Sequence, residues 1–149
     1  MEELTEGDPR DVVLENARRK ARAVAGDLVL ACDTEVNVDG AVFGKPADED
    51  DAVRMLTQLS GRTHVVLGGL VLRRDDVERE AIAATNVHFR ELDADEVRAY
   101  VATGEWRGRA GGYAIQGRGA ALVEKIEGDF WNVVGLPVPE LVRLLKSPC

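Results

Sequence analysis

The chain has 149 residues, 45% hydrophobic and 31% charged, a composition typical of one globular domain and not of a disordered chain. Its net charge of −8 argues against broad electrostatic binding to nucleic acid or an anionic membrane. No apolar run approaches the roughly 20 residues that cross a bilayer. A small anionic ligand remains possible, because repulsion by the whole surface is screened beyond about 8–10 Å.

The cysteines indicate a reducing compartment. Cys32 stands in an apolar segment and Cys149 is the last residue, so the pair does not form a disulfide framework. The N-terminus is acidic and polar, without a visible signal peptide. We therefore expect a cytoplasmic protein with a single domain over residues 1–149.

The first predicted elements are a helix and a buried strand. Asp8 followed by Pro9 is typical of a helix start, and the helix is predicted to run to about residue 25, before Gly26. Residues 28–32 form a short apolar run that predicts a buried strand. The inward stripe of the helix is predicted to hold Leu14, Ala17, Ala21 and Val24.

A hairpin is predicted directly after this strand. Asp39-Gly40 suits a two-residue turn, and the returning segment ends on Gly44-Lys45-Pro46. That register places Thr34 opposite Lys45 and Asp33 opposite Pro46. A carboxylate, a hydroxyl and an ammonium then share one end of a rigid element, and these groups suit a metal-bound phosphate.

The remaining elements follow in order. Asp48 caps a helix that stops at Ser60-Gly61, and Asp93 caps a third helix. Residues 63–73 and 77–92 predict a long antiparallel pair, 103–119 are glycine-rich, 120–126 predict a strand, 130–137 are irregular and 139–146 predict a terminal helix. The order predicts an α/β or α+β fold with a mixed sheet.

Seven short segments stand in one order along nearly the whole chain: Ala17-Arg18-Arg19-Lys20-Ala21, Asp33-Thr34, Gly44-Lys45-Pro46, Leu59-Ser60-Gly61-Arg62-Thr63-His64-Val65-Val66, Tyr100-Val101-Ala102-Thr103-Gly104-Glu105, Ala110-Gly111-Gly112-Tyr113-Ala114-Ile115-Gln116-Gly117 and Asn132-Val133-Val134-Gly135-Leu136-Pro137. This ordered set resembles the Maf family of nucleoside triphosphate pyrophosphatases, also called septum formation inhibitor Maf. The Ile-Gln-Gly form is similar to the branch that acts on dTTP and UTP.

The resemblance implies an elongated, curved mixed sheet flanked by helices, with a cleft between two lobes, as in inosine triphosphate pyrophosphatases. It also implies a divalent metal, Mg or Mn, and a homodimer. Three positions depart from the family pattern. No Ser-x-x-Arg phosphate-binding loop stands near Met1, Arg109 replaces a lysine, and Gly68-Gly69 replace a Thr-Gly pair.

Asp33 is the candidate metal ligand and general base for water attack. By local pattern alone it is an aspartate that ends a strand, and the family spacing of Thr34 and the Gly-Lys-Pro segment favours the catalytic interpretation. Lys45, held between a glycine and a proline, is the candidate phosphate contact, or else a surface lysine.

The resemblance implies further substrate contacts. Only the family motif distinguishes Lys20 from the surface charges Arg18 and Arg19. Thr34 and Gln116 are candidates for reading a base edge or a phosphate oxygen. Arg109 either clamps phosphate through its planar guanidinium or is a surface charge.

A second metal ligand is implied shortly before the first helix, where Glu3 ranks above its competitors Glu2 and Glu6. His64 and His88 are interpreted as structural. The aromatic residues are interpreted as core or interface: Tyr100, Trp106, Phe130 and Trp131.

Two functions are therefore carried forward from the sequence. The first is metal-assisted hydrolysis of dTTP, UTP and modified pyrimidine nucleotides to the monophosphate and pyrophosphate. The alternative is a nucleotide-binding or interaction protein whose catalysis is impaired because the N-terminal phosphate-binding loop is absent.

Overall fold

The computed structural model describes residues 6–146, which form helices, strands and two short 3-10 segments. No helix within this range is long and apolar enough to cross a membrane. The elements in chain order are α1 (Pro9–Arg22), β1 (Leu28–Val38), β2 (Ala41–Phe43), α2 (Glu49–Leu59), β3 (Thr63–Arg74), β4 (Val77–Phe89), α3 (Ala94–Ala102), η1 (Ala110–Gly112), η2 (Arg118–Leu122), β5 (Val123–Glu127), α4 (Phe130–Val134) and α5 (Val138–Lys146).

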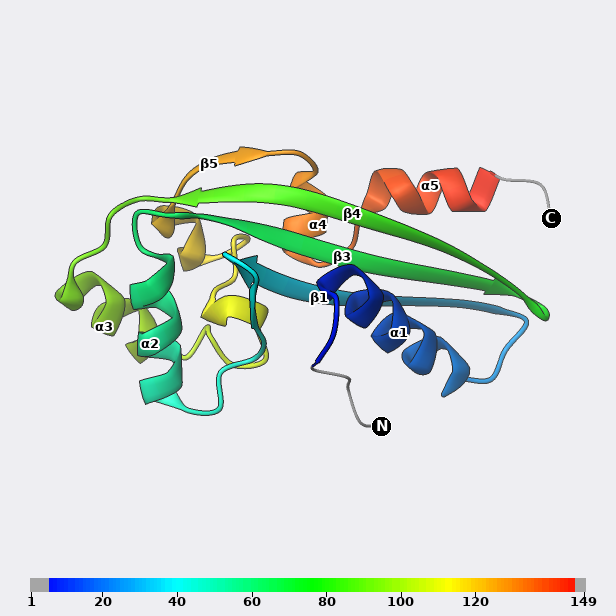
Figure 1. The fold of residues 1–149 in the computed structure, drawn as a ribbon, viewed down its shortest axis with the longest axis horizontal. Helices are drawn as coiled ribbons and strands as arrows, with labels where there is room; N and C mark the ends of the chain where they lie inside the picture. The colour runs from blue at the N-terminus through cyan, green and yellow to red at the C-terminus, as the bar shows by residue number, and fades with distance from the viewer. Residues whose placement is uncertain (1–5, 147–149) are drawn as a thin grey trace.

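A five-stranded sheet in the order β2-β1-β3-β4-β5 forms the centre of the molecule. The long strands β3 and β4 run along the molecule, with α2 and α3 near one end and α1 and α5 flanking the other (Figure 1). This confirms the predicted fold class. The sheet differs from the expected mixed sheet in one respect. Its four strand pairs in residues 6–146 are all antiparallel, whereas a mixed sheet also contains parallel pairs.

Helices approach both faces of the sheet very closely at the Gly68-Gly69 pair of β3. A Cβ atom on Gly68 would lie 2.0 Å from Oδ1 of Asn132 in α4, and one on Gly69 would lie 2.6 Å from the carbonyl oxygen of Val13 in α1. Consecutive strand residues point to opposite faces. The two glycines therefore let α4 approach one face and α1 the other.

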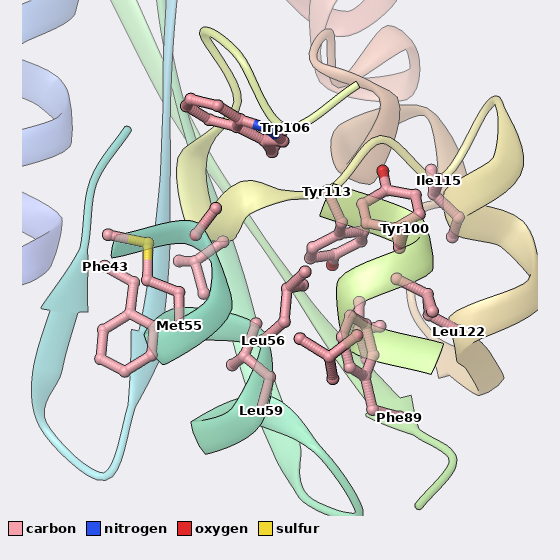
Figure 2. Close-up of a cluster of buried hydrophobic side chains, with 14 of the residues drawn as sticks. Phe43, Met55, Leu56, Leu59, Phe89, Tyr100, Trp106, Tyr113, Ile115 and Leu122 are labelled. Atoms are coloured by element: carbon pink, nitrogen blue, oxygen red, sulfur yellow. The ribbon is translucent and has the colours of Figure 1, made fainter. Parts of the chain in front are cut away.

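Two apolar clusters form the core. The smaller one joins α1 to β1 and β3 through small side chains, namely Ala17, Ala21, Val29, Ala31 and Val71. The larger one surrounds α2, α3 and the 3-10 segments, and Figure 2 shows its leucines beside an aromatic group. Phe89, Tyr113 and His64 pack there with edge-on ring contacts.

Two local expectations are wrong. The first helix ends at Arg22, so Val24 lies outside the inward stripe and is 54% exposed. Residues 130–134 form the short helix α4, because the Asp129 side chain accepts a hydrogen bond from the Trp131 amide. This helix buries Asn132 and leaves Phe130 and Trp131 exposed, which excludes the core for both and leaves the interface interpretation a prediction. Tyr100 and Trp106 are buried, as expected.

The hairpin register is confirmed where the strands pair. Val38 lies opposite Ala41 and Val36 opposite Phe43, which is the register that the Asp39-Gly40 turn predicts. The ladder ends there and does not reach Thr34 or Lys45. The carbonyl of Gly44 instead accepts a hydrogen bond from the Gly111 amide at 3.1 Å, and Pro46 has no N–H to continue the ladder.

Candidate active site

A cavity of about 230 Å³ lies between the outer edge of β1, the loop after α3 and the end of α4. Every substrate-contact candidate from the sequence lines it, and so does the candidate general base Asp33. The substrate-contact candidates are Lys20, Thr34, Lys45, Arg109 and Gln116. These residues span almost 100 positions of the chain. The fold therefore brings together side chains that the sequence could identify only one by one.

The edge of β1 supplies three consecutive residues, Cys32, Asp33 and Thr34, to this cavity. On its inner side β1 pairs with β3, where Asp33 lies opposite Gly69 and Thr34 opposite Gly68. Within residues 6–146 its outer side pairs only at 36–38. A cavity along a strand edge is reached by side chains from both faces of the strand, which explains how neighbours contribute together.

Asp33 and Lys20 form the closest ion pair of the site. The Lys20 ammonium donates to Oδ1 of Asp33 at 2.6 Å. The Asp33 side chain is 7% exposed and that of Lys20 is 31% exposed. The carboxylate is therefore shielded from bulk water and faces the cavity, with a cation from α1 at its side.

Two more cations face the cavity from separate segments. Lys45 follows β2, and Arg109 precedes the η1 segment. The hydrogen bond from the Gly111 amide to the Gly44 carbonyl joins these two segments. From residues 6–146 the lining thus receives three cationic side chains and one carboxylate, in a chain whose overall charge is −8.

The thiol of Cys32 was not predicted to belong to the site. It donates to the carbonyl oxygen of Gly135 at 3.2 Å. Burial, together with the neighbouring Asp33 carboxylate, raises the pKa of the Cys32 thiol to about 11. A thiol that stays protonated at neutral pH is a poor nucleophile.

Tyr113 is a second lining residue that the sequence did not identify as part of the site. Its hydroxyl lies 2.6 Å from Nε2 of His64, and burial raises its pKa. Neither His64 nor His88 lines the cavity. His88 instead contacts Thr63 at 2.5 Å and Glu127 at 2.9 Å, on the far side of β3.

The donor set fits a divalent cation only in part. Within residues 6–146 no group of three or more His, Cys, Asp or Glu side chains is placed to hold a metal ion. Glu3 and Glu2 lie outside the described residues, and Glu6 does not line the cavity. Mg²⁺ is often held by one or two carboxylates together with substrate phosphates and water, and Asp33 fits that role.

The fold and the cavity define an α/β protein with a cavity lined by several cationic side chains. The sequence matches the family described as Maf-like protein over residues 1–148, and the chain belongs to that family. The resemblance seen in the seven ordered segments is thereby confirmed.

Several relatives carry the name dTTP/UTP pyrophosphatase. The protein of that name from Anaeromyxobacter dehalogenans is 54% identical over 142 residues, covering 93% of this chain and 73% of the relative. The one from Pyrococcus furiosus is 44% identical over 149 residues, covering 97% and 78%. The one from Thermococcus kodakarensis is 46% identical over 151 residues, covering 98% and 80%.

Proposed function

We propose that this chain is a nucleoside triphosphate pyrophosphatase that converts dTTP, UTP and modified pyrimidine nucleotides to the monophosphate and pyrophosphate. The observation that carries the proposal is the lining of the cavity, to which the described part of the chain contributes three cations and one shielded carboxylate. A triphosphate needs such local positive charge to approach a protein of net charge −8. The names of the relatives support the choice of nucleotide.

In the proposed reaction a water molecule attacks the α-phosphorus. The bond from that phosphorus to the α–β bridging oxygen breaks, and pyrophosphate leaves with the electron pair. Asp33 accepts the proton of the water, since among residues 6–146 it is the only carboxylate that lines the cavity. Lys20, Lys45 and Arg109 bind the phosphate oxygens and offset the negative charge that develops on them.

A divalent cation, Mg or Mn, is proposed as the cofactor, with Asp33 as its ligand from the described residues. When bound, such an ion neutralises phosphate charge and lowers the pKa of coordinated water. In the structure the Lys20 ammonium contacts Asp33 directly. Lys20 therefore holds the carboxylate oriented toward the cavity.

The test measures pyrophosphate release from a panel of nucleotides with Mg²⁺ or Mn²⁺. We expect release from dTTP and UTP, and in H₂¹⁸O we expect the label in the monophosphate. Asp33→Asn should lower turnover about 10²–10⁴-fold while the protein stays folded. The matched control is Asp76→Asn, because Asp76 is an exposed aspartate in the turn between β3 and β4.

The proposal fails in two distinguishable ways. Near-normal turnover by a folded Asp33→Asn protein would remove Asp33 from the mechanism. Binding of dTTP without pyrophosphate release by the unsubstituted chain would favour the alternative, a nucleotide-binding protein with impaired catalysis.

A further inference from the structure

The loop that carries Gln116 is held at both ends by hydrogen bonds from its backbone to two side chains. The Ala114 amide donates to the Tyr100 hydroxyl at 3.0 Å. After Gln116, the Arg118 amide donates to Oε2 of Glu105 at 3.1 Å, and the Gly119 amide donates to Oε1 at 3.0 Å. Gln116 therefore lies midway between fixed points on a segment that lines the cavity.

The two side chains are also joined to each other. The Tyr100 hydroxyl donates to Oε1 of Glu105 at 2.7 Å, so one carboxylate organises both ends of the loop. Burial by itself would raise the pKa of Glu105, but the hydrogen bonds from Tyr100 and the two amides outweigh it, and the pKa is lowered. Glu105 is thus ionised at neutral pH. An ionised carboxylate accepts stronger hydrogen bonds than a neutral acceptor does.

The loop backbone follows the carboxylate so closely that a side chain would not fit between them. A Cβ atom on Gly117 would lie 2.6 Å from Oε2 and 2.9 Å from Oε1 of Glu105. Gly117 is the residue directly after Gln116. The place of Gln116 in the cavity wall is therefore set by the distance between the loop and this carboxylate.

Tyr100 anchors this arrangement to the core. It is 6% exposed and packs in the larger apolar cluster, where Figure 2 shows it beside Tyr113 and Ile115. Glu105 follows α3 by three residues and does not line the cavity. It acts on the cavity through the loop that it holds, and its charge also interacts with Arg109 in the lining.

We propose that Glu105 is a positioning residue that sets nucleotide preference by fixing Gln116 in the cavity wall. The inference rests on the proposed function, because it assumes that the cavity receives a nucleotide. An amide side chain such as Gln116 distinguishes bases only if its donor and its acceptor are held in one orientation. Glu105 supplies that constraint from outside the cavity.

The test is the conservative substitution Glu105→Gln. Glutamine keeps the length of the side chain, but its NH₂ group must face a backbone N–H that now lacks an acceptor. We expect the kcat/KM ratio of dTTP to dGTP to fall about tenfold, the effect of one misplaced hydrogen bond. The matched control is Glu140→Gln, because Glu140 lies on α5 and pairs with Arg143 of the same helix, away from the loop.

Two further readouts separate positioning from a general loss of stability. In Glu105→Gln, hydrogen exchange at the Arg118 and Gly119 amides should be faster than in Glu140→Gln. In a Gln116→Ala background, Glu105→Gln should change the dTTP to dGTP ratio no further, because the residue that it positions is gone. A merely structural role would add its effect in both backgrounds.

The outcomes also separate this inference from the proposed function. An unchanged ratio in Glu105→Gln, with discrimination by the unsubstituted chain, overturns the positioning role and leaves the pyrophosphatase proposal standing. If the unsubstituted chain releases no pyrophosphate, that proposal falls, and the ratio is measured from equilibrium binding of dTTP and dGTP. Absence of binding by the unsubstituted chain overturns both.

Discussion

Acid should destabilise this protein through one buried side chain, His64. The imidazole is 1% exposed, with Nε2 at 2.6 Å from the Tyr113 hydroxyl. Its other nitrogen, Nδ1, has no hydrogen-bond partner among residues 6–146. The Phe89 and Tyr113 rings pack edge-on against it. A charged imidazolium in this place would lose its hydration without gaining an acceptor at Nδ1, so the folded protein strongly favours the neutral form.

The size and sign of the effect follow from the pKa of His64. Burial lowers this pKa from 6.5 to about 4, and His88 contributes a smaller effect in the same direction. Between these two pH values the unfolded chain binds more protons than the folded one, so the free energy of unfolding falls as the pH falls. At about 1.36 kcal/mol for each pH unit, the loss between pH 6.5 and pH 4 is about 3 kcal/mol.

Urea unfolding of the unsubstituted protein and His64→Gln across pH 4–7.5 measures this contribution. The carboxylates titrate in both proteins, so their effects cancel in the difference between the two free energies. We expect that difference to change by about 3 kcal/mol across the window. Val87→Ala, a core truncation opposite His64 in the β3–β4 ladder, should keep the pH dependence of the unsubstituted protein. A difference that does not vary with pH would refute the reasoning.

Two substitutions test the close contacts of the helices with the sheet. Gly69→Ala should lower the free energy of unfolding by about 1–3 kcal/mol. The new Cβ would lie 2.6 Å from the Val13 carbonyl oxygen and push α1 outward. An unchanged free energy in urea unfolding would show that α1 can shift without cost. Asn132→Leu should lower stability by about 1–3 kcal/mol, because the carbonyl of Val66 and the hydroxyl of Thr85 lose their buried donor. A thermal midpoint equal to that of the unsubstituted protein would contradict this.

The hairpin shows what the sequence can predict and where local pattern stops being informative. Asp39-Gly40 predicts the register correctly because the turn type is encoded in two adjacent residues. The same rule, extended to Lys45, fails because the strand ends at Phe43. The carbonyl of Gly44, directly after the strand, instead accepts a hydrogen bond from the amide of Gly111, a residue almost 70 positions away. Lys45 still reaches the cavity, but along a path that the hairpin rule does not describe.

The role of Glu105 shows a different limit. Asp33 and Gln116 stand in segments that the family resemblance identifies as part of the site. Glu105 is also part of a matching segment, but no sequence pattern shows that its two oxygens accept hydrogen bonds from amides 13 and 14 residues later. A contact between a side chain and a distant backbone amide depends on the path of the loop, and that path is a property of the whole fold.

Glycine and alanine residues between α1 and the sheet allow the close packing on which the Lys20–Asp33 contact depends. Asp33 lies opposite Gly69, and the absence of a Cβ there lets the α1 backbone come close to the sheet. The alanines of α1 continue that close packing over Ala31. Only at this separation does Lys20 reach Asp33 at 2.6 Å. Gly69→Ala should therefore lengthen the Lys20–Asp33 contact as well as destabilise the fold. A crystal structure of that variant with the contact unchanged would show that the glycine serves packing alone.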